Sequence, residues 1–173
     1  APLMFFWALT ILLFIKATGD GRWRWWLGTG LVAGLGLLSK YSMGVLAVGL
    51  LAWLLADRAH RHWLADVRLW AGLLVAALVV APNLWWNAQN DFISFRHTAE
   101  ISQLDRDLFH PERLLEFIAA QFGVFGPVFM GLFLWKAFSP SSYREDRHRL
   151  MLLTALAMLG VISVQALLTR AHP

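Results

Sequence analysis

Long apolar runs separated by short polar segments make up most of the 173-residue chain. A helix needs about 20 predominantly apolar residues to cross the hydrocarbon core of a bilayer. By this criterion the pattern predicts an all-α, polytopic transmembrane helical bundle in which residues 1-173 form a single domain. We expect about six spans, at residues 3–17, 25–39, 41–56, 69–85, 122–138 and 150–168.

The second and third spans come from one apolar stretch, residues 25–56, which Ser39 and Lys40 interrupt near its middle. As a single helix this stretch would be about 48 Å long, which is too long for one crossing of a core about 30 Å thick. We therefore expect two short helices that meet at Lys40, with a single tilted helix and a buried lysine as the alternative. Gly30 and Gly34 form a G-x-x-x-G pair, which lets membrane helices approach closely.

The longest polar segment, residues 87–121, lies between the fourth and fifth spans. Within it, Pro111 followed by Glu112 is typical of the first turn of a helix. Apolar residues then recur at helical spacing on one face up to Phe122. This pattern predicts an amphipathic helix that lies on the membrane surface before the fifth span.

The composition agrees with a membrane protein, because 58% of the residues are hydrophobic and only 15% are charged. A soluble domain usually carries about 25% charged residues. The basic residues lie between apolar runs, whereas nucleic-acid binding would need them clustered on a soluble face; we expect no nucleic-acid partner. The chain has no cysteine, which excludes a disulfide framework and a thiolate metal site.

Charge predicts the direction of the spans, because Lys and Arg concentrate in short cytoplasmic loops. Six alternating spans place ten of the 15 basic residues on one side, in segments 16–24, 57–68 and 136–149. The other side holds Lys40, the 87–121 loop and Arg170. We therefore expect the three basic segments to be cytoplasmic and the 87–121 loop to be extracytoplasmic.

Lys40 is the first candidate functional residue, because an ammonium in an apolar stretch costs about 2.5–3.5 kcal/mol at a helix centre and usually serves a function or has a partner. Polar residues flank it on both sides, in the order Ser39, Lys40, Tyr41, Ser42. It could bind a lipid phosphate at the membrane surface. It could also be a turn lysine whose stem reaches the interface.

Aromatic, amide and cationic side chains alternate over residues 81–97, an arrangement that can stack on sugar faces and hydrogen-bond to hydroxyls. The same residues would also suit an interfacial aromatic belt. Asp105 and Asp107 form a D-x-D that could hold a divalent ion, but Arg106 between them supplies a competing charge. We expect no metal site and no cofactor, and leave assistance by a divalent metal open.

Four segments, in order along the chain, resemble the bacterial family 39 glycosyltransferases, which are dolichyl-phosphate-mannose-protein mannosyltransferase-like membrane enzymes. Residues 30–41, GLVAGLGLLSKY, look like their glycine-rich span and lysine. Residues 82–87 together with 92–97 resemble their loop motif. Residues 121–127 look like the start of the following span, and residues 170–173 are similar to the beginning of a later motif.

This resemblance implies part of a C-type glycosyltransferase fold in the bacterial inner (plasma) membrane. It implies transfer of a sugar from a polyprenyl-phosphate-linked donor to a lipid, glycan or protein acceptor on the extracytoplasmic side. Membrane lipids are the other expected partners. The family's catalytic carboxylate belongs to a first outer loop without a counterpart here. We therefore expect an internal fragment, with the catalytic residue upstream of Ala1 and no activity of the fragment alone.

The resemblance also suggests substrate-binding residues. Lys40 is the favoured cation for the lipid phosphate, since a fixed charge would stabilise this leaving group. The full set expected to bind substrate is Lys40, Tyr41, Asn87, Arg96, His97, Arg170 and His172.

Two other functions remain open. A transporter or flippase would also contain short helices broken by glycine and a charge near the midplane, although no inverted repeat is visible. A non-catalytic membrane scaffold would use the aromatic residues as an interfacial belt and Lys40 as an anchor.

Overall fold

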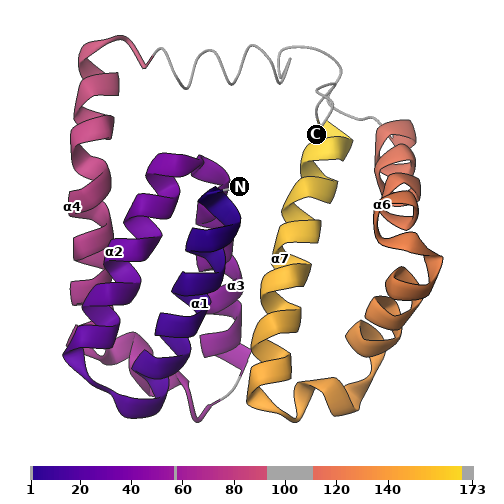
Figure 1. The fold of residues 1–173 in the computed structure, drawn as a ribbon, viewed down its shortest axis with the longest axis horizontal. Helices are drawn as coiled ribbons and strands as arrows, with labels where there is room; N and C mark the ends of the chain where they lie inside the picture. The colour runs from indigo at the N-terminus through magenta and orange to yellow at the C-terminus, as the bar shows by residue number, and fades with distance from the viewer. Residues whose placement is uncertain (1, 57, 93–110, 169–173) are drawn as a thin grey trace. The chain divides into compact units, whose positions relative to one another are not determined.

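The computed structural model of the chain describes residues 2–56, 58–92 and 111–168 (Figure 1). These residues are almost entirely helical and contain no strand, which confirms the predicted all-α class. They belong to two compact units, unit 1 at Ala1–Phe92 and unit 2 at Ile93–Pro173.

The described residues of unit 1 form α-helices joined by short turns (Figure 1). α2 packs against both α1 and α4, whereas α3 meets the rest of the unit chiefly through the turns on either side of it. In chain order the elements are α1 at Pro2–Asp20, α2 at Trp23–Ser39, the 3-10 turn η1 at Tyr41–Met43, α3 at Gly44–Ala56, the 3-10 turn η2 at Arg61–Ala65, and α4 at Val67–Gln89.

Glycines allow α2 and α4 to approach until their backbones touch. A Cβ on Gly30 would lie 2.0 Å from the carbonyl oxygen of Gly72, and a Cβ on Gly72 would lie 2.7 Å from that of Trp26. A Cβ on Gly34 would lie 2.8 Å from the Cβ of Val79. The G-x-x-x-G pair therefore faces α4, and its predicted role in close helix packing is confirmed.

The backbone leaves the helical region at Lys40, where φ is −161° and ψ is 128°. α2 ends at Ser39 and α3 begins at Gly44. Residues 25–56 therefore form two helices and not one tilted helix, and Lys40 is exposed instead of buried.

α4 continues beyond the span predicted for it, 69–85. Pro82 lies inside the helix and does not end it. A proline removes one helical hydrogen bond, a loss that neighbouring groups compensate in membrane helices. Asn90 ends the helix instead, because its backbone N–H and its side-chain amide donate to the Trp86 carbonyl at 3.1 and 2.7 Å. Asn87, which we placed in a loop, is therefore helical.

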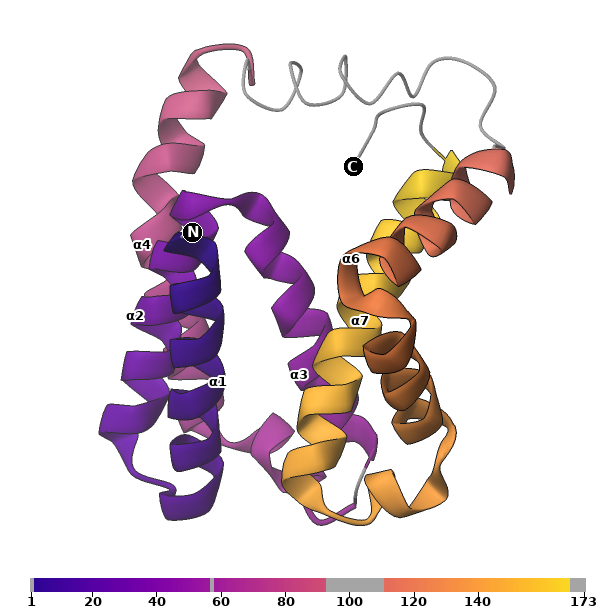
Figure 2. The same cartoon turned by 45° about the vertical axis from the view of Figure 1, so that its right-hand side comes forward.

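The described residues of unit 2 form two packed helices, α6 at Pro111–Phe138 and α7 at Asp146–Leu168, joined by the 3-10 turn η3 at Pro140–Tyr143. α6 is sharply bent at Gly126, where φ is 73° and ψ is 150° (Figure 2). The cause is Pro127, because proline disfavours the α conformation in the residue before it and glycine tolerates a positive φ.

The boundary predicted at residue 122, between an amphipathic surface helix and a fifth span at 122–138, is not marked by a helix end. Helix α6 runs without interruption from Pro111 to the bend at Gly126, because no residue before the Gly126–Pro127 pair stops it. Since α4 also extends past its predicted end, helices occupy both ends of the predicted 87–121 loop. Residues 93–110 of that loop lie outside the described residues.

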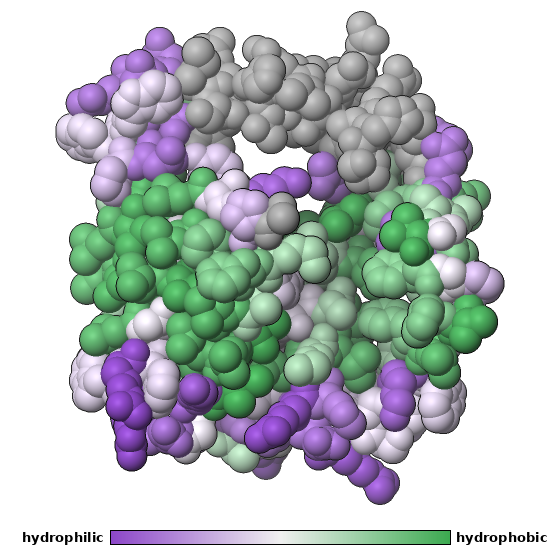
Figure 3. Space-filling view, viewed as in Figure 1, coloured by the Kyte–Doolittle hydropathy of each residue, from purple (hydrophilic) through white to green (hydrophobic). Residues whose placement is uncertain are grey.

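Among the described residues, four helical segments are long and apolar enough to cross a membrane: α1, α4, Leu114–Phe138 and Asp146–Leu167. α2, with 17 residues, and the apolar segment Tyr41–Ala56 are shorter. Within each unit, hydrophobic side chains cover the middle of the helices and hydrophilic ones gather at the helix ends (Figure 3). These features support a multi-pass membrane protein, and separate crossings by α2 and α3 stay a prediction.

Candidate functional site

The turn between α2 and α3 lies at the same end of unit 1 as the last turns of α4, and we call this the Lys40 end. The Tyr41 hydroxyl in the turn donates a hydrogen bond to Asn83 Oδ1 in α4, at 2.5 Å. This bond joins residues 42 positions apart in the sequence.

Lys40 presents its ammonium from this turn. The backbone of Lys40 is held on both sides, since its N–H donates to the Gly36 carbonyl at 3.0 Å and its carbonyl accepts from the Met43 N–H at 2.9 Å. The side chain is exposed. Among the described residues it has no ion pair and no hydrogen bond. A cation with a fixed backbone at the end of apolar helices is suited to bind an anionic headgroup.

Asn83 also contacts Asn87, one helical turn further along α4. The Asn87 side-chain amide donates to the Asn83 carbonyl at 3.0 Å and lies 3.4 Å from Asn83 Oδ1. Residues four apart share one face of a helix. The side chains of Tyr41, Asn83 and Asn87 consequently form a hydrogen-bonded series that runs from the turn into α4.

Asn87 is fully buried, with 0% of its surface exposed. Its amide nitrogen is bonded to Asn83, but its Oδ1 has no hydrogen-bond partner among the described residues. Burying an amide oxygen without a hydrogen-bond donor destabilises the fold, because the oxygen loses its hydrogen bonds to water. This oxygen could accept a hydrogen bond only from water or from a ligand hydroxyl that reaches the buried site.

The structure brings three of the seven predicted substrate-binding residues to the Lys40 end: Lys40, Tyr41 and Asn87. The other four, and the D-x-D at 105–107, lie outside the described residues; these four are Arg96, His97, Arg170 and His172. Sequence reasoning missed Asn83. Its spacing of four residues from Asn87 was the available signal, because residues four apart share one face of a helix.

The opposite end of unit 1 contains the turn between α1 and α2 together with η2, and we call this the basic end. Apart from Lys40, all Lys and Arg residues of unit 1 lie in or next to these connections: Lys16, Arg22, Arg24, Arg58, Arg61 and Arg68.

Aromatic side chains fill the interior next to the basic end. Phe14 of α1 meets Trp26 of α2 and Trp53 of α3 edge to face, with ring centroids 5.9 and 5.6 Å apart. Trp26 also contacts Trp63 of η2 at 5.1 Å. All four side chains are buried, so this cluster connects every helix except α4 to η2.

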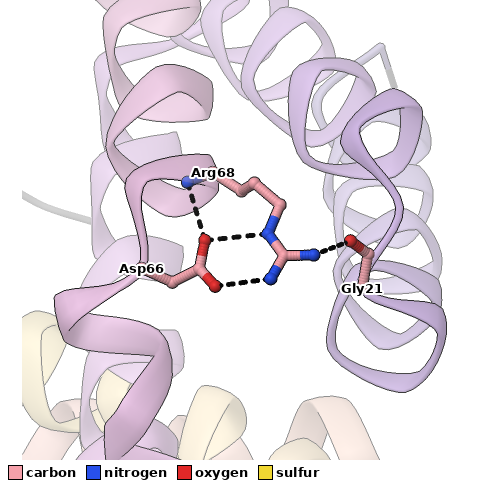
Figure 4. Close-up of polar contacts among 3 residues, drawn as sticks. All are labelled: Gly21, Asp66 and Arg68. Carbon is pink, nitrogen blue, oxygen red and sulfur yellow. Dashed lines mark hydrogen bonds and ion pairs between the residues drawn. The ribbon is translucent and has the colours of Figure 1, made fainter.

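Arg68 ties the start of α4 to the turn between α1 and α2 (Figure 4). Its guanidinium donates to both carboxylate oxygens of Asp66, at 2.9 and 2.7 Å, and to the Gly21 carbonyl. Asp66 also caps α4 by accepting from the Arg68 backbone N–H at 2.8 Å. The side-chain bonds from Arg68, followed by this backbone bond, hold the pKa of the Asp66 carboxyl below its usual value.

Each unit also contains an apolar cavity. In unit 1 a cavity of about 370 Å³ lies between α3 and the pair α2 and α4, and its lining extends from Leu37 near the Lys40 turn to Trp26 at the basic end. In unit 2 a cavity of about 770 Å³ lies between α6 and α7, with Glu116 and Gln121 among its mostly apolar lining residues. Both cavities suit hydrocarbon better than a polar ligand.

Residues 1–86 match the family model described as dolichyl-phosphate-mannose-protein mannosyltransferase. The matched residues include Lys40, Tyr41 and Asn83. Residues 1–86 belong to this family. The match confirms the resemblance inferred from the glycine-rich span and the lysine.

The chain is similar to a lipid A galacturonosyltransferase of Rhizobium johnstonii, with 34% identity over 171 residues. The alignment covers 98% of the chain and 36% of the relative, so the chain spans about a third of that protein's length. No solved structure matches the chain. Within residues 2–56, 58–92 and 111–168, no group of three or more His, Asp or Glu side chains is placed to hold a metal ion.

Proposed function

We propose that the chain is part of a membrane glycosyltransferase that transfers a sugar from a polyprenyl-phosphate donor to a lipid, glycan or protein acceptor. The family is named for dolichyl-phosphate-mannose, and the relative is named for a galacturonosyl group and for lipid A. These names favour a glycosyltransferase over a transporter, a flippase or a scaffold.

The observation that carries the proposal is the exposed Lys40 ammonium, which has no partner among the described residues and extends from a backbone held by Gly36 and Met43. Sugar transfer breaks the bond between the anomeric carbon and a phosphate oxygen, so negative charge develops on the lipid phosphate. A preorganised cation stabilises such a leaving group. In this proposal Lys40 holds the donor phosphate, and the unpartnered Asn87 Oδ1 accepts a hydrogen bond from a sugar or acceptor hydroxyl.

The remaining step is attack of the acceptor hydroxyl on the anomeric carbon, with its proton passing to a carboxylate. We assign this base to no residue of the chain. The resemblance places the family's catalytic carboxylate in a first outer loop that has no counterpart here. Arg96 and Arg170 are secondary candidates for the donor phosphate, and His97 and His172 for the sugar or acceptor.

We further propose that the Lys40 end faces the extracytoplasmic side of the bacterial inner membrane. The basic end of unit 1 carries six Lys and Arg residues and the Lys40 end carries only Lys40. Cytoplasmic loops are enriched in Lys and Arg, so this distribution favours a cytoplasmic basic end.

The proposal is tested by measuring binding of farnesyl phosphate, a short polyprenyl phosphate, to the chain in phosphatidylcholine nanodiscs. Lys40→Met is expected to weaken binding by about 10- to 100-fold, because hydrogen bonds to charged groups contribute about 1.5–3 kcal/mol. Lys40→Arg should restore only part of the affinity, because a planar guanidinium does not replace a compact ammonium. Farnesol, which has no phosphate, should bind the Lys40→Met variant and the unchanged chain equally.

Lys16→Met is the matched control, because Lys16 is also exposed but lies near the basic end, where it rests 4.6 Å from the centroid of the Trp25 ring. It should leave farnesyl phosphate binding unchanged. In the enzyme, Lys40→Met should also lower transfer of galacturonic acid from a polyprenyl-phosphate donor to lipid A, by about 10²–10³-fold. Unchanged binding in Lys40→Met, or an equal loss in Lys16→Met, would contradict the assignment of Lys40.

A further inference from the structure

The Lys40 turn is held against α4 by the hydrogen bond between Tyr41 and Asn83. The proposed function gives Asn83 no role. Lys40 has an extended backbone, and Tyr41 follows it directly in η1. The Tyr41 hydroxyl reaches across to Asn83 Oδ1 at 2.5 Å. The position of the turn relative to α4 therefore depends on a side-chain bond made one residue away from the ammonium.

Asn83 is itself held in place from inside the helix bundle. Asn87 donates its amide to the Asn83 carbonyl at 3.0 Å, and the same nitrogen lies 3.4 Å from Asn83 Oδ1. Asn87 is fully buried, whereas Asn83 is half-buried and Tyr41 is 41% exposed. The three side chains thus connect a rigid interior position to the exposed turn.

We propose that Asn83 is a positioning residue, which keeps Lys40 in place to bind an anionic lipid phosphate by holding the Tyr41 hydroxyl. The inference rests on the proposed function, because it concerns the same phosphate site. Asn83 does not touch the phosphate; it acts through Tyr41 and the backbone of the turn.

The chemistry of the contact explains why a neutral amide suits this position. An amide oxygen accepts the Tyr41 hydroxyl without adding charge. A carboxylate at position 83 would accept the same bond, but it would place a negative charge near Lys40. Such a charge would attract the ammonium and repel a phosphate. A leucine would remove the bond and add no charge.

These differences set the expected order of affinities for farnesyl phosphate in phosphatidylcholine nanodiscs. Tyr41→Phe and Asn83→Leu should each weaken binding by about three- to ten-fold, as expected for loss of one hydrogen bond. The double variant should bind no worse than the weaker single variant, because both changes remove the same bond. Asn83→Asp should weaken binding more than Asn83→Leu does.

Which of the two Asn83 variants binds farnesyl phosphate more weakly shows whether Asn83 positions the Lys40 charge or only stabilises the fold. If Asn83 only stabilised the fold, Asn83→Asp would be the milder change, because it keeps the bond to Tyr41. Tyr41→Phe removes a single oxygen atom and provides a test that does not depend on how well the Asn83 variants fold. Helicity and thermal unfolding of each variant, measured by circular dichroism, report folding directly.

Two matched controls are present in the chain. Tyr143→Phe removes the other tyrosine hydroxyl, which donates to the Ala137 carbonyl at 2.7 Å in unit 2. Asn90→Leu removes an exposed asparagine amide at the end of α4, which donates to the Trp86 carbonyl. Both should leave farnesyl phosphate binding unchanged.

Unchanged binding in Tyr41→Phe, or binding by Asn83→Asp that equals or exceeds that of Asn83→Leu, would overturn the inference. If Lys40→Met weakens binding while these variants do not, only the positioning role fails. If Lys40→Met binds normally, the phosphate role of Lys40 in the proposed function fails, and the positioning role fails with it.

Discussion

Charged side chains at the two ends of unit 1 have different surroundings. The Arg68 guanidinium is enclosed by hydrogen bonds to Asp66 and Gly21, whereas the Lys40 ammonium has no partner among the described residues. A cation that already has its acceptors holds structure together, and one without them is available to a ligand. At the scale of single residues this difference separates the structural cation from the candidate functional one.

Asp66 makes the stability of unit 1 depend on pH. Its carboxyl has a lowered pKa, caused first by the side-chain bonds from Arg68. A carboxyl with a pKa lower in the folded than in the unfolded chain stabilises the fold above its unfolded pKa, about 3.9. The contribution disappears as the pH falls through the lowered pKa. We therefore expect Asp66→Asn to reduce the difference in Tm between about pH 6 and about pH 3, measured by circular dichroism in detergent.

Asp91→Asn is the control for this prediction, because it changes another exposed aspartate, one that follows α4 and lies far along the chain from Arg68. The pH dependence of Tm in this variant should match that of the unchanged chain. The same pH dependence in Asp66→Asn would show that the ion pair contributes nothing to stability.

At the scale of elements, the backbones of α2 and α4 approach each other closely. The tightness of this contact comes from glycines at positions 30, 34 and 72. Helices in lipid gain stability from packing more than from hydrophobic burial. The position of α4, and with it Asn83 and Asn87 at the Lys40 end, therefore depends on the absence of side chains in this contact.

Gly30→Ala is expected to destabilise the chain by about 1–3 kcal/mol, the usual cost of overpacking, because its Cβ would lie 2.0 Å from the Gly72 carbonyl oxygen. Gly28→Ala, on the same helix, would bring its Cβ only to an ordinary 3.6 Å from Leu13 Cδ1 and should be neutral or stabilising. Unfolding in mixed detergent and dodecyl sulfate micelles measures both. Equal stability of the two variants would mean that the close contact is absent.

The bend in α6 has a backbone origin. A Cβ added at Gly126 would meet nothing within 4 Å, but φ of 73° is unfavourable for any other residue. Gly126→Ala should therefore cost about 1–3 kcal/mol through backbone strain alone. Gly131→Ala, also with nothing within 4 Å, has no such strain and serves as control in the same unfolding assay. If Gly126→Ala is as stable as Gly131→Ala, residue 126 does not adopt this conformation.

At the scale of the whole molecule, the sidedness of the chain follows from its basic residues. The chain has no cysteine, so single introduced cysteines report accessibility without background. We expect Cys at Asn90 to react with a membrane-impermeant maleimide from the extracytoplasmic side of intact cells. Cys at Ser141 should react only after the membrane is permeabilised. Labelling of both positions in intact cells would contradict the proposed topology.

The apolar runs determined the all-α class, the position of most helices and the break at Lys40. These features depend on local hydrophobicity and on the cost of burying a charge. Both properties follow from residues that are close together in the sequence. The helix ends were less predictable. Pro82 did not end α4 and the amphipathic pattern did not end before Phe122, because a helix in an apolar environment continues until its last carbonyls find other donors or a residue cannot adopt its backbone conformation.

The sequence by itself determined that Lys40, with its polar neighbours, is the unusual charge of the amino-terminal half. It determined that Gly30 and Gly34 allow a close helix contact, but not with which helix. Only the tertiary structure decided that α4 is that partner and that Asn83 meets Tyr41 across 42 residues. The physical reason is that contacts between distant segments depend on the rotation and depth at which helices pack, which the periodicity of one helix does not specify.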